Sequence, residues 1–62
     1  MAKTTGEKLQ ALRGQRSIED AAQLIRISPQ ALTAYEQGER IPRDTVKIRI
    51  AAAYNMPIEA IF

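Results

Sequence analysis

Residues 17–38, with the sequence SIEDAAQLIRISPQALTAYEQG, predict two short helices joined by a tight turn. The second helix begins at Ser28-Pro29, because a serine oxygen can accept hydrogen bonds from free backbone N–H groups and proline suits the first helical position. It ends at Gly38, since glycine most easily adopts the left-handed conformation that terminates a helix. The sequence of this segment therefore sets both ends of the second helix.

The second helix of this pair has an inward and an outward stripe. Leu32 and Tyr35 recur at the three-residue step that directs one stripe toward a core. The other side chains are nearly uncharged; Gln and Thr can hydrogen-bond base edges, and Ala fits against a thymine methyl. We interpret the outward stripe as a surface that reads bases in the major groove of DNA, formed by Gln30, Thr33, Ala34 and Gln37. An ordinary solvent-exposed helix face is the alternative interpretation.

Length and composition limit the protein to one domain without catalytic or metal chemistry. We assign the single domain to residues 1–62, with 1–4 as a flexible N-terminal arm. A domain of this size buries only about 60% of the surface of its unfolded chain, so marginal stability is expected. The chain has no cysteine and no histidine, which removes thiolate ligands, the commonest general base and the commonest metal ligand. We expect no catalytic residues, no metal, no cofactor and no enzyme activity.

The charge balance weakly favours a polyanionic partner. The formal net charge is +2, and residues 40–49 carry four basic side chains against one acidic side chain. No apolar run approaches the roughly 20 residues that a membrane span requires, and the N-terminal residues lack the apolar stretch of a secretory signal. We expect a cytoplasmic protein with no membrane association and no small-molecule effector.

Three further helices are expected around the central pair. Residues 4–7 fit a capping box, which predicts a first helix running to about residue 13. A fourth helix begins at residue 43 or 44 and ends at Asn55, and a short last turn follows Pro57. No stretch alternates with period two, so no strand is expected. The apolar side chains expected to face the core are Leu9, Leu12, Ile18, Ala21, Ala22, Ile25, Val46, Ile50, Ala53 and Tyr54, with Leu24 at the margin.

The order and spacing of these segments resemble the helix-turn-helix domain of phage lambda-type repressors and Cro proteins, also called the XRE-like family. The resemblance runs from Gly6 to Phe62 and is carried by GEKLQALR, SIEDAAQLIRIS, PQALTAYEQGERIP and AAAYNMPIEAIF. It implies an all-α fold of five helices, with the helix-turn-helix at the second and third. It also implies double-stranded operator DNA as the ligand, a symmetric dimer, and an ion pair between Arg13 and Glu36 that braces the reading helix.

The chain departs from the family pattern in ways that favour a second hypothesis. Ile18 stands where many members carry a glutamine that touches the DNA backbone, and Arg26 occupies a turn position where glycine is common. Left-handed geometry at Arg26 costs roughly 1–2 kcal/mol. The link between Arg13 and Ser17 is also short. The alternative is therefore a protein-interaction module that keeps the helix-turn-helix fold without strong DNA binding.

Hydroxyl groups, helix N-termini and loop cations are the groups that contact DNA phosphates and fix the register of a protein on the duplex. By these criteria the candidates for phosphate contact are Ser17, Ser28, Arg40, Arg43 and Lys47. The two serines also serve as helix caps. For Arg16 and Arg49 two interpretations stay equally open: each side chain contacts a phosphate, or each is a solvent-exposed charge without a contact.

The apolar C-terminal end can close the core or meet a second subunit. In the resembling family this end often forms the two-fold contact, and we assign the dimer interface to Ile58, Ile61 and Phe62. Ile58 is expected mostly in the core, and the other two are shared with a partner. Two copies would place their reading helices about 34 Å apart, which requires a near-palindromic site. The sequence predicts a homodimeric DNA-binding regulator of transcription, expected to be a repressor.

Overall fold

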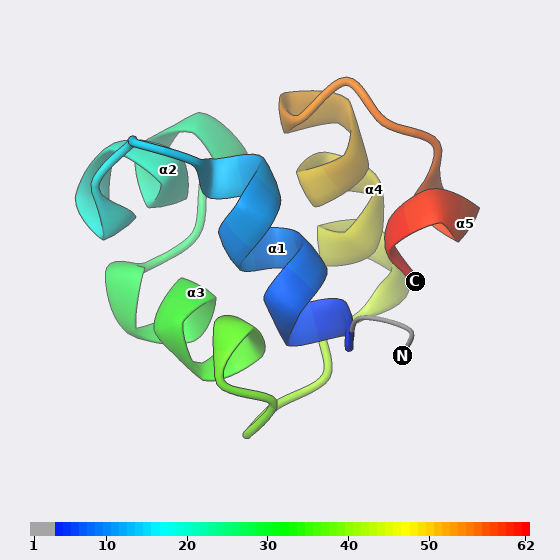
Figure 1. The fold of residues 1–62 in the computed structure, drawn as a ribbon, viewed down its shortest axis with the longest axis horizontal. Coiled ribbons are helices and arrows are strands. Elements are labelled where there is room, and N and C mark those ends of the chain that lie inside the picture. The colour runs from blue at the N-terminus through cyan, green and yellow to red at the C-terminus, as the bar shows by residue number, and fades with distance from the viewer. Residues whose placement is uncertain (1–3) are drawn as a thin grey trace.

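The computed structural model describes residues 4–62, which form five α-helices and no strand. Their bounds are α1 Thr5–Arg13, α2 Ile18–Ile25, α3 Pro29–Glu36, α4 Asp44–Ala53 and α5 Ile58–Ile61. Helix α1 lies in the middle, with α2 and α3 on one side and α4 and α5 on the other (Figure 1). The predicted all-α architecture of five helices is confirmed.

Side-chain caps fix the starts of the first three helices. The Thr4 hydroxyl and the Glu7 carboxylate form a reciprocal capping box at the start of α1. The Ser17 Oγ accepts a hydrogen bond from the Asp20 N–H at 3.1 Å at the start of α2. At the start of α3, the Ser28 Oγ accepts one from the Ala31 N–H at 3.1 Å. Each cap pairs an N–H that the helix leaves without a partner. Residues 1–3 of the predicted arm lie outside the described residues.

Three helices end at a residue in the left-handed conformation. Gly38 after α3 has φ 76° and Asn55 after α4 has φ 55°, as the turn signals of the sequence predict. Arg26 after α2 has φ 69°, although its Cβ makes this conformation cost about 1–2 kcal/mol. The Arg49 side chain, on α4, donates from Nη1 to the Arg26 carbonyl oxygen at 3.3 Å and so holds this turn against α4.

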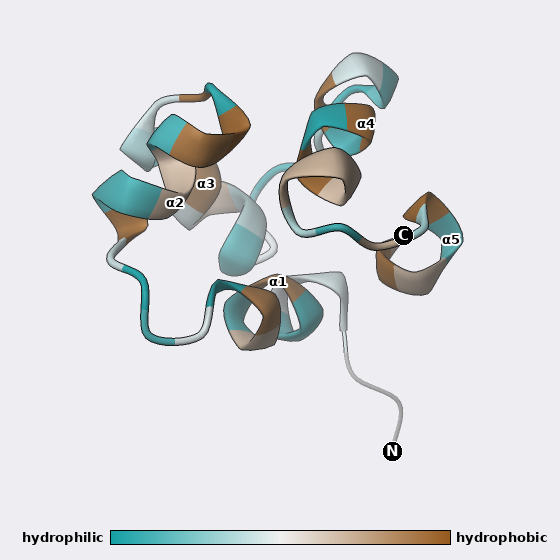
Figure 2. Ribbon diagram, turned by 90° about the horizontal axis from the view of Figure 1, so that it is seen from above, coloured by the Kyte–Doolittle hydropathy of each residue, from teal (hydrophilic) through white to brown (hydrophobic). Residues whose placement is uncertain are grey.

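The core lies between α1 and the other four helices. Apolar and polar residues are interspersed along the helices (Figure 2), and the buried apolar side chains come from all five of them. Ala21 and Ala22 are buried, and their small side chains let α2 pack closely against its neighbours. Leu24 at the margin is 47% exposed. The buried apolar residues are Leu9, Ala21, Ala22, Ile25, Leu32, Tyr35, Ile50, Ala51 and Ile61.

Gly6 makes the contact between α1 and α3 unusually close. A Cβ atom at this position would overlap the backbone carbonyl oxygen of Glu36, the last residue of α3. Gln10, one turn further along α1, donates from Nε2 to the same carbonyl oxygen at 3.4 Å. Helix α1 therefore fixes the C-terminal end of α3 through backbone contact.

The expected roles of two C-terminal isoleucines are reversed in the structure. Ile58, which we expected in the core, is 37% exposed, so that prediction is wrong. Ile61, which we expected to contact a partner subunit, is 1% exposed within its own chain. It therefore offers almost no surface to a second subunit. Because side chains three residues apart lie on the same side of a helix, the difference comes from how the turn of α5 packs against α1 and α4.

Candidate nucleic-acid interface

The outward stripe of α3 lies on the surface. Gln30 and Gln37 are exposed, while Thr33 and Ala34 are half-buried. On the opposite side of the helix, Leu32 is fully buried. Gln30, Thr33 and Ala34 therefore line one hollow on the outer face of α3, whose inner face is covered by α1 and α2. Gln37 is the C-cap residue that follows α3, and it lines a different hollow.

A buried ion pair attaches the end of α3 to α1. The Arg13 Nε lies 2.8 Å from the Glu36 Oε2, and the Arg13 Nη2 donates to the Glu36 Oε1 at 3.1 Å. Arg13 also donates from Nη1 to the Arg16 carbonyl oxygen at 3.0 Å. Hydrogen bonding to the Glu36 carboxylate raises the pKa of Arg13 above its ordinary value. The pair that the resemblance implies is thus present, and its two-pronged geometry resists rotation of α3.

A buried hydroxyl lies beside this ion pair. The Tyr54 hydroxyl is buried, and among residues 4–62 it has no hydrogen-bond partner. Burial raises the pKa of Tyr54, and the nearby negative charge of Glu36 raises it further. This side chain stays neutral at physiological pH and contributes to packing.

A shallow hollow runs along the N-terminal and central part of the outer face of α3. Three of the four base-reading candidates line it: Gln30, Thr33 and Ala34. Its other walls come from Ile18, Glu19, Pro29 and Glu39. The hollow therefore has both polar and apolar lining residues. Two of them carry carboxylates, and none carries a basic side chain.

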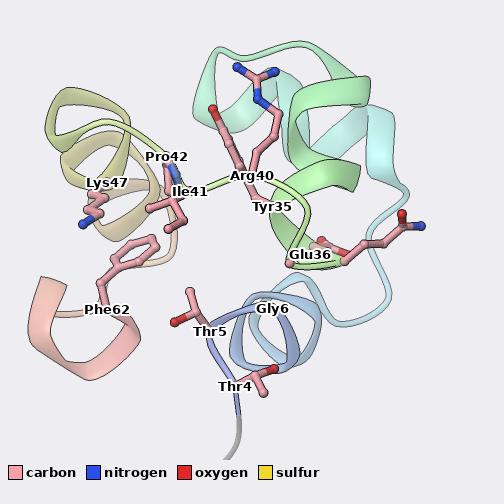
Figure 3. Close-up of a pocket in the computed structure, with 12 residues that line it drawn as sticks. Thr4, Thr5, Gly6, Tyr35, Glu36, Arg40, Ile41, Pro42, Lys47 and Phe62 are labelled. Atoms are coloured by element: carbon pink, nitrogen blue, oxygen red, sulfur yellow. The ribbon is translucent and has the colours of Figure 1, made fainter.

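Two of the three cations predicted to contact phosphates lie away from the hollow of α3. Arg40 and Lys47 line a second hollow, between the start of α1, residues 38–42 and the end of α5, together with Gln37 (Figure 3). The Arg40 guanidinium lies over the Tyr35 ring, 5.9 Å from its centroid. The Lys47 Nζ lies 5.5 Å from the centroid of the Phe62 ring. Both cations contact aromatic rings and are not fully free.

The other phosphate candidates occupy helix starts. Ser17 and Ser28 are exposed, and each hydroxyl already accepts a hydrogen bond from its own helix, which leaves its O–H free to donate. Arg43 is the exposed N-cap residue of α4 and makes no side-chain capping bond. Arg43 is the least constrained of the predicted cations.

Two features escaped the sequence analysis. Arg49, left open between phosphate contact and free charge, supports the Arg26 turn. Glu39 borders the hollow of α3, although it lies beyond the helix. Neither placement has a sequence signal of its own, because each depends on how the turn after a helix brings distant residues together.

Residues 4–62 contain no group of three or more histidine, cysteine or acidic side chains placed to hold a metal ion. None of the five helices has the length and hydrophobicity to cross a lipid bilayer.

Two helices joined by a tight turn, with the second presenting an uncovered polar stripe, define a helix-turn-helix domain, a class of DNA-binding domain. The chain belongs to the family described as "Helix-turn-helix domain", whose family model matches residues 5–61. Comparisons with curated proteins and with solved structures gave no match.

Proposed function

We propose that the protein is a sequence-specific regulator of transcription that binds double-stranded DNA through α3, in the manner of the lambda-type repressors and Cro proteins that its sequence resembles. It acts as a homodimer and represses transcription by occupying a near-palindromic operator. We also propose that it acts in the cytoplasm.

The observation that carries this proposal is the contrast between the two sides of α3. Its inner side is buried and tied to α1 by the Arg13–Glu36 pair, whereas its outer stripe has side chains that can contact base edges. An uncovered amide such as Gln30 on a rigid helix needs no rearrangement before binding. Gln30, near the start of α3, is the side chain we assign to base recognition.

Phosphate contacts would position α3 without reading sequence. Ser17 and Ser28 offer hydroxyl groups at the starts of the two helices, and Arg43 offers an uncommitted charge. Arg40 and Lys47 lie over aromatic rings, so their contribution to phosphate binding depends on releasing those contacts. Arg43 is therefore expected to contribute most of the sequence-independent attraction.

The proposed dimer contact lies on α4 and α5. Ile48 is 56% exposed and lines a hollow with Ile58 and Phe62. Asp44, Lys47 and Glu59 surround this apolar area, so a two-fold axis can bring opposite charges together. Helices α3 and α5 lie on opposite sides of the molecule (Figure 1). Two copies joined through α4 and α5 would therefore leave both reading helices uncovered.

Analytical ultracentrifugation over a range of concentrations tests this contact. Ile48→Glu is expected to shift the population to monomer, because it places a charge in the apolar contact. Leu24→Glu, on an α2 side chain that is 47% exposed, is the matched control and should leave association unchanged. If both variants self-associate to the same extent as the wild type, this surface is not the dimer contact.

The DNA-binding proposal is tested by selecting duplexes from a random pool and measuring affinity by fluorescence anisotropy. Gln30→Ala should lower the ratio of selected to random affinity. Arg43→Ala should weaken both alike and reduce the salt slope of the dimer by about two, because each subunit loses one phosphate contact. Gln23→Ala, an exposed glutamine on α2, is the matched control. With five or six phosphates contacted per dimer, raising salt from about 50 to 200 mM should cost roughly a thousandfold in affinity.

The protein-interaction module is the second candidate, and the border of the α3 hollow favours it. Glu19 and Glu39 repel phosphates, and Ile18 offers an apolar contact where the resembling family carries a glutamine. Absence of DNA binding at low salt, or binding that does not respond to salt, would support this candidate and reject the regulator.

A further inference from the structure

We propose that Glu39 is a base-reading residue that selects cytosine at one position of each half-site. This inference rests on the proposed function and assigns to the DNA-facing surface a residue outside the α3 stripe. It also gives the Glu39 carboxylate a role in recognition, although the same carboxylate repels DNA phosphates.

The backbone of Glu39 is fixed to α3. Gly38 reverses the chain with φ 76°, and the Glu39 N–H then donates to the carbonyl oxygen of Ala34 at 2.9 Å. A second bond, from the Gly38 N–H to the Tyr35 carbonyl oxygen at 3.3 Å, completes the turn. Glu39 therefore keeps a constant position relative to the outer face of α3 and would enter a groove with it.

The Glu39 carboxylate carries an uncompensated charge. Within residues 4–62 the one ion pair with an N···O distance of 4.0 Å or less joins Arg13 to Glu36, so Glu39 has no such partner there. Its neighbour Arg40 lies over the Tyr35 ring and lines the other hollow. Glu39 itself is exposed and borders the hollow of Gln30 and its neighbours.

A free carboxylate has few favourable partners on DNA. It repels phosphates, and it cannot bond to guanine N7 or O6 or to thymine O4, because all of these groups are acceptors. Adenine offers an N6 amino donor, but its N7 acceptor lies beside that donor and repels the second carboxylate oxygen. The N4 amino group of cytosine is a donor without an adjacent acceptor on the same base, and it pairs with glutamate in direct readout. Glu39 is thus suited to favour cytosine and, through repulsion, to weaken binding to random sequence.

The test compares Glu39→Gln with Asp20→Asn in base selection and anisotropy measurements on the full chain. Both substitutions remove one negative charge, and Asp20 is an exposed residue on α2 whose side chain is not among the lining residues of the α3 hollow. Glu39→Gln should lose a cytosine preference of about tenfold at one position per half-site and should bind random duplexes more tightly. Asp20→Asn should keep the preference.

Two results would overturn the assignment, and they differ. If Glu39→Gln tightens binding to all duplexes by one factor and base preferences stay as in the wild type, the carboxylate only repels DNA and the proposed function stands. If the wild type binds no duplex at low salt, the proposed function and this assignment fail together.

Discussion

Replacing Arg13 by methionine is expected to destabilise the protein severely, because it leaves a buried carboxylate without its partner. The Glu36 side chain is 4% exposed and the Arg13 side chain 24% exposed. Removing one member of a buried pair costs about 3–5 kcal/mol. Water can reach the partly exposed Arg13 position, so we expect a loss of about 3 kcal/mol, near the lower end of that range.

This loss is comparable to the whole stability of such a small domain, for which a single core supplies about 3–5 kcal/mol. Arg13→Met should therefore be extensively unfolded at 25 °C. Urea denaturation followed by circular dichroism at 222 nm measures the difference. Arg16→Met is the matched control, since the Arg16 side chain is exposed and only its carbonyl oxygen contacts Arg13. Its change should stay within about 0.5 kcal/mol.

A second substitution separates loss of the pair from loss of packing. Arg13→Met combined with Glu36→Met removes both charges and should recover most of the lost stability, because apolar replacements of a buried pair are often neutral or stabilising. The reasoning is refuted if Arg13→Met costs no more than Arg16→Met, or if the double variant is no more stable than the single variant.

Three further substitutions test other parts of the fold, each by urea denaturation. Gly6→Ala should lose about 1–3 kcal/mol, since the new methyl group overlaps the Glu36 carbonyl oxygen; an unchanged midpoint contradicts the close approach of α1 and α3. Arg26→Gly should gain up to about 1 kcal/mol, because glycine adopts φ 69° without the Cβ penalty; a loss would mean that the turn is not strained. Tyr54→Phe should gain about 1 kcal/mol at neutral pH by removing a buried hydroxyl that has no partner among residues 4–62. Burial raises the pKa of Tyr54, so the unfolded chain ionises first and wild-type stability should fall as pH rises above about 10; Tyr54→Phe should show a smaller fall, and equal slopes would contradict the shift.

The helix boundaries could be predicted because they depend on local chemistry. The serine caps, the capping box at Thr4 and the left-handed residues Gly38 and Asn55 act within a few residues of their own position. The outward stripe of α3 followed from the helical period alone. The Arg13–Glu36 pair joins residues 23 apart in the chain, and only the family resemblance indicated it.

The features that could not be predicted depend on packing between distant segments. In the single turn of α5, Ile58 and Ile61 have equal hydrophobicity, and only the position of the turn against α1 and α4 decides which one is buried. The contacts of Arg40, in the loop after α3, and Lys47, on α4, with aromatic rings arise in the same way, since no local pattern shows which ring a distant cation will meet.

Dimethyl sulfate protection on a selected duplex tests most directly whether α3 enters the major groove. The reagent methylates guanine N7, which lies in the major groove, and adenine N3, which lies in the minor groove. We expect protection of guanine N7 in two half-sites about one helical turn apart, unprotected adenine N3, and weaker N7 protection with Gln30→Ala. Protection confined to adenine N3, or an N7 pattern that Gln30→Ala leaves unchanged, would contradict the assignment of α3 as the reading helix.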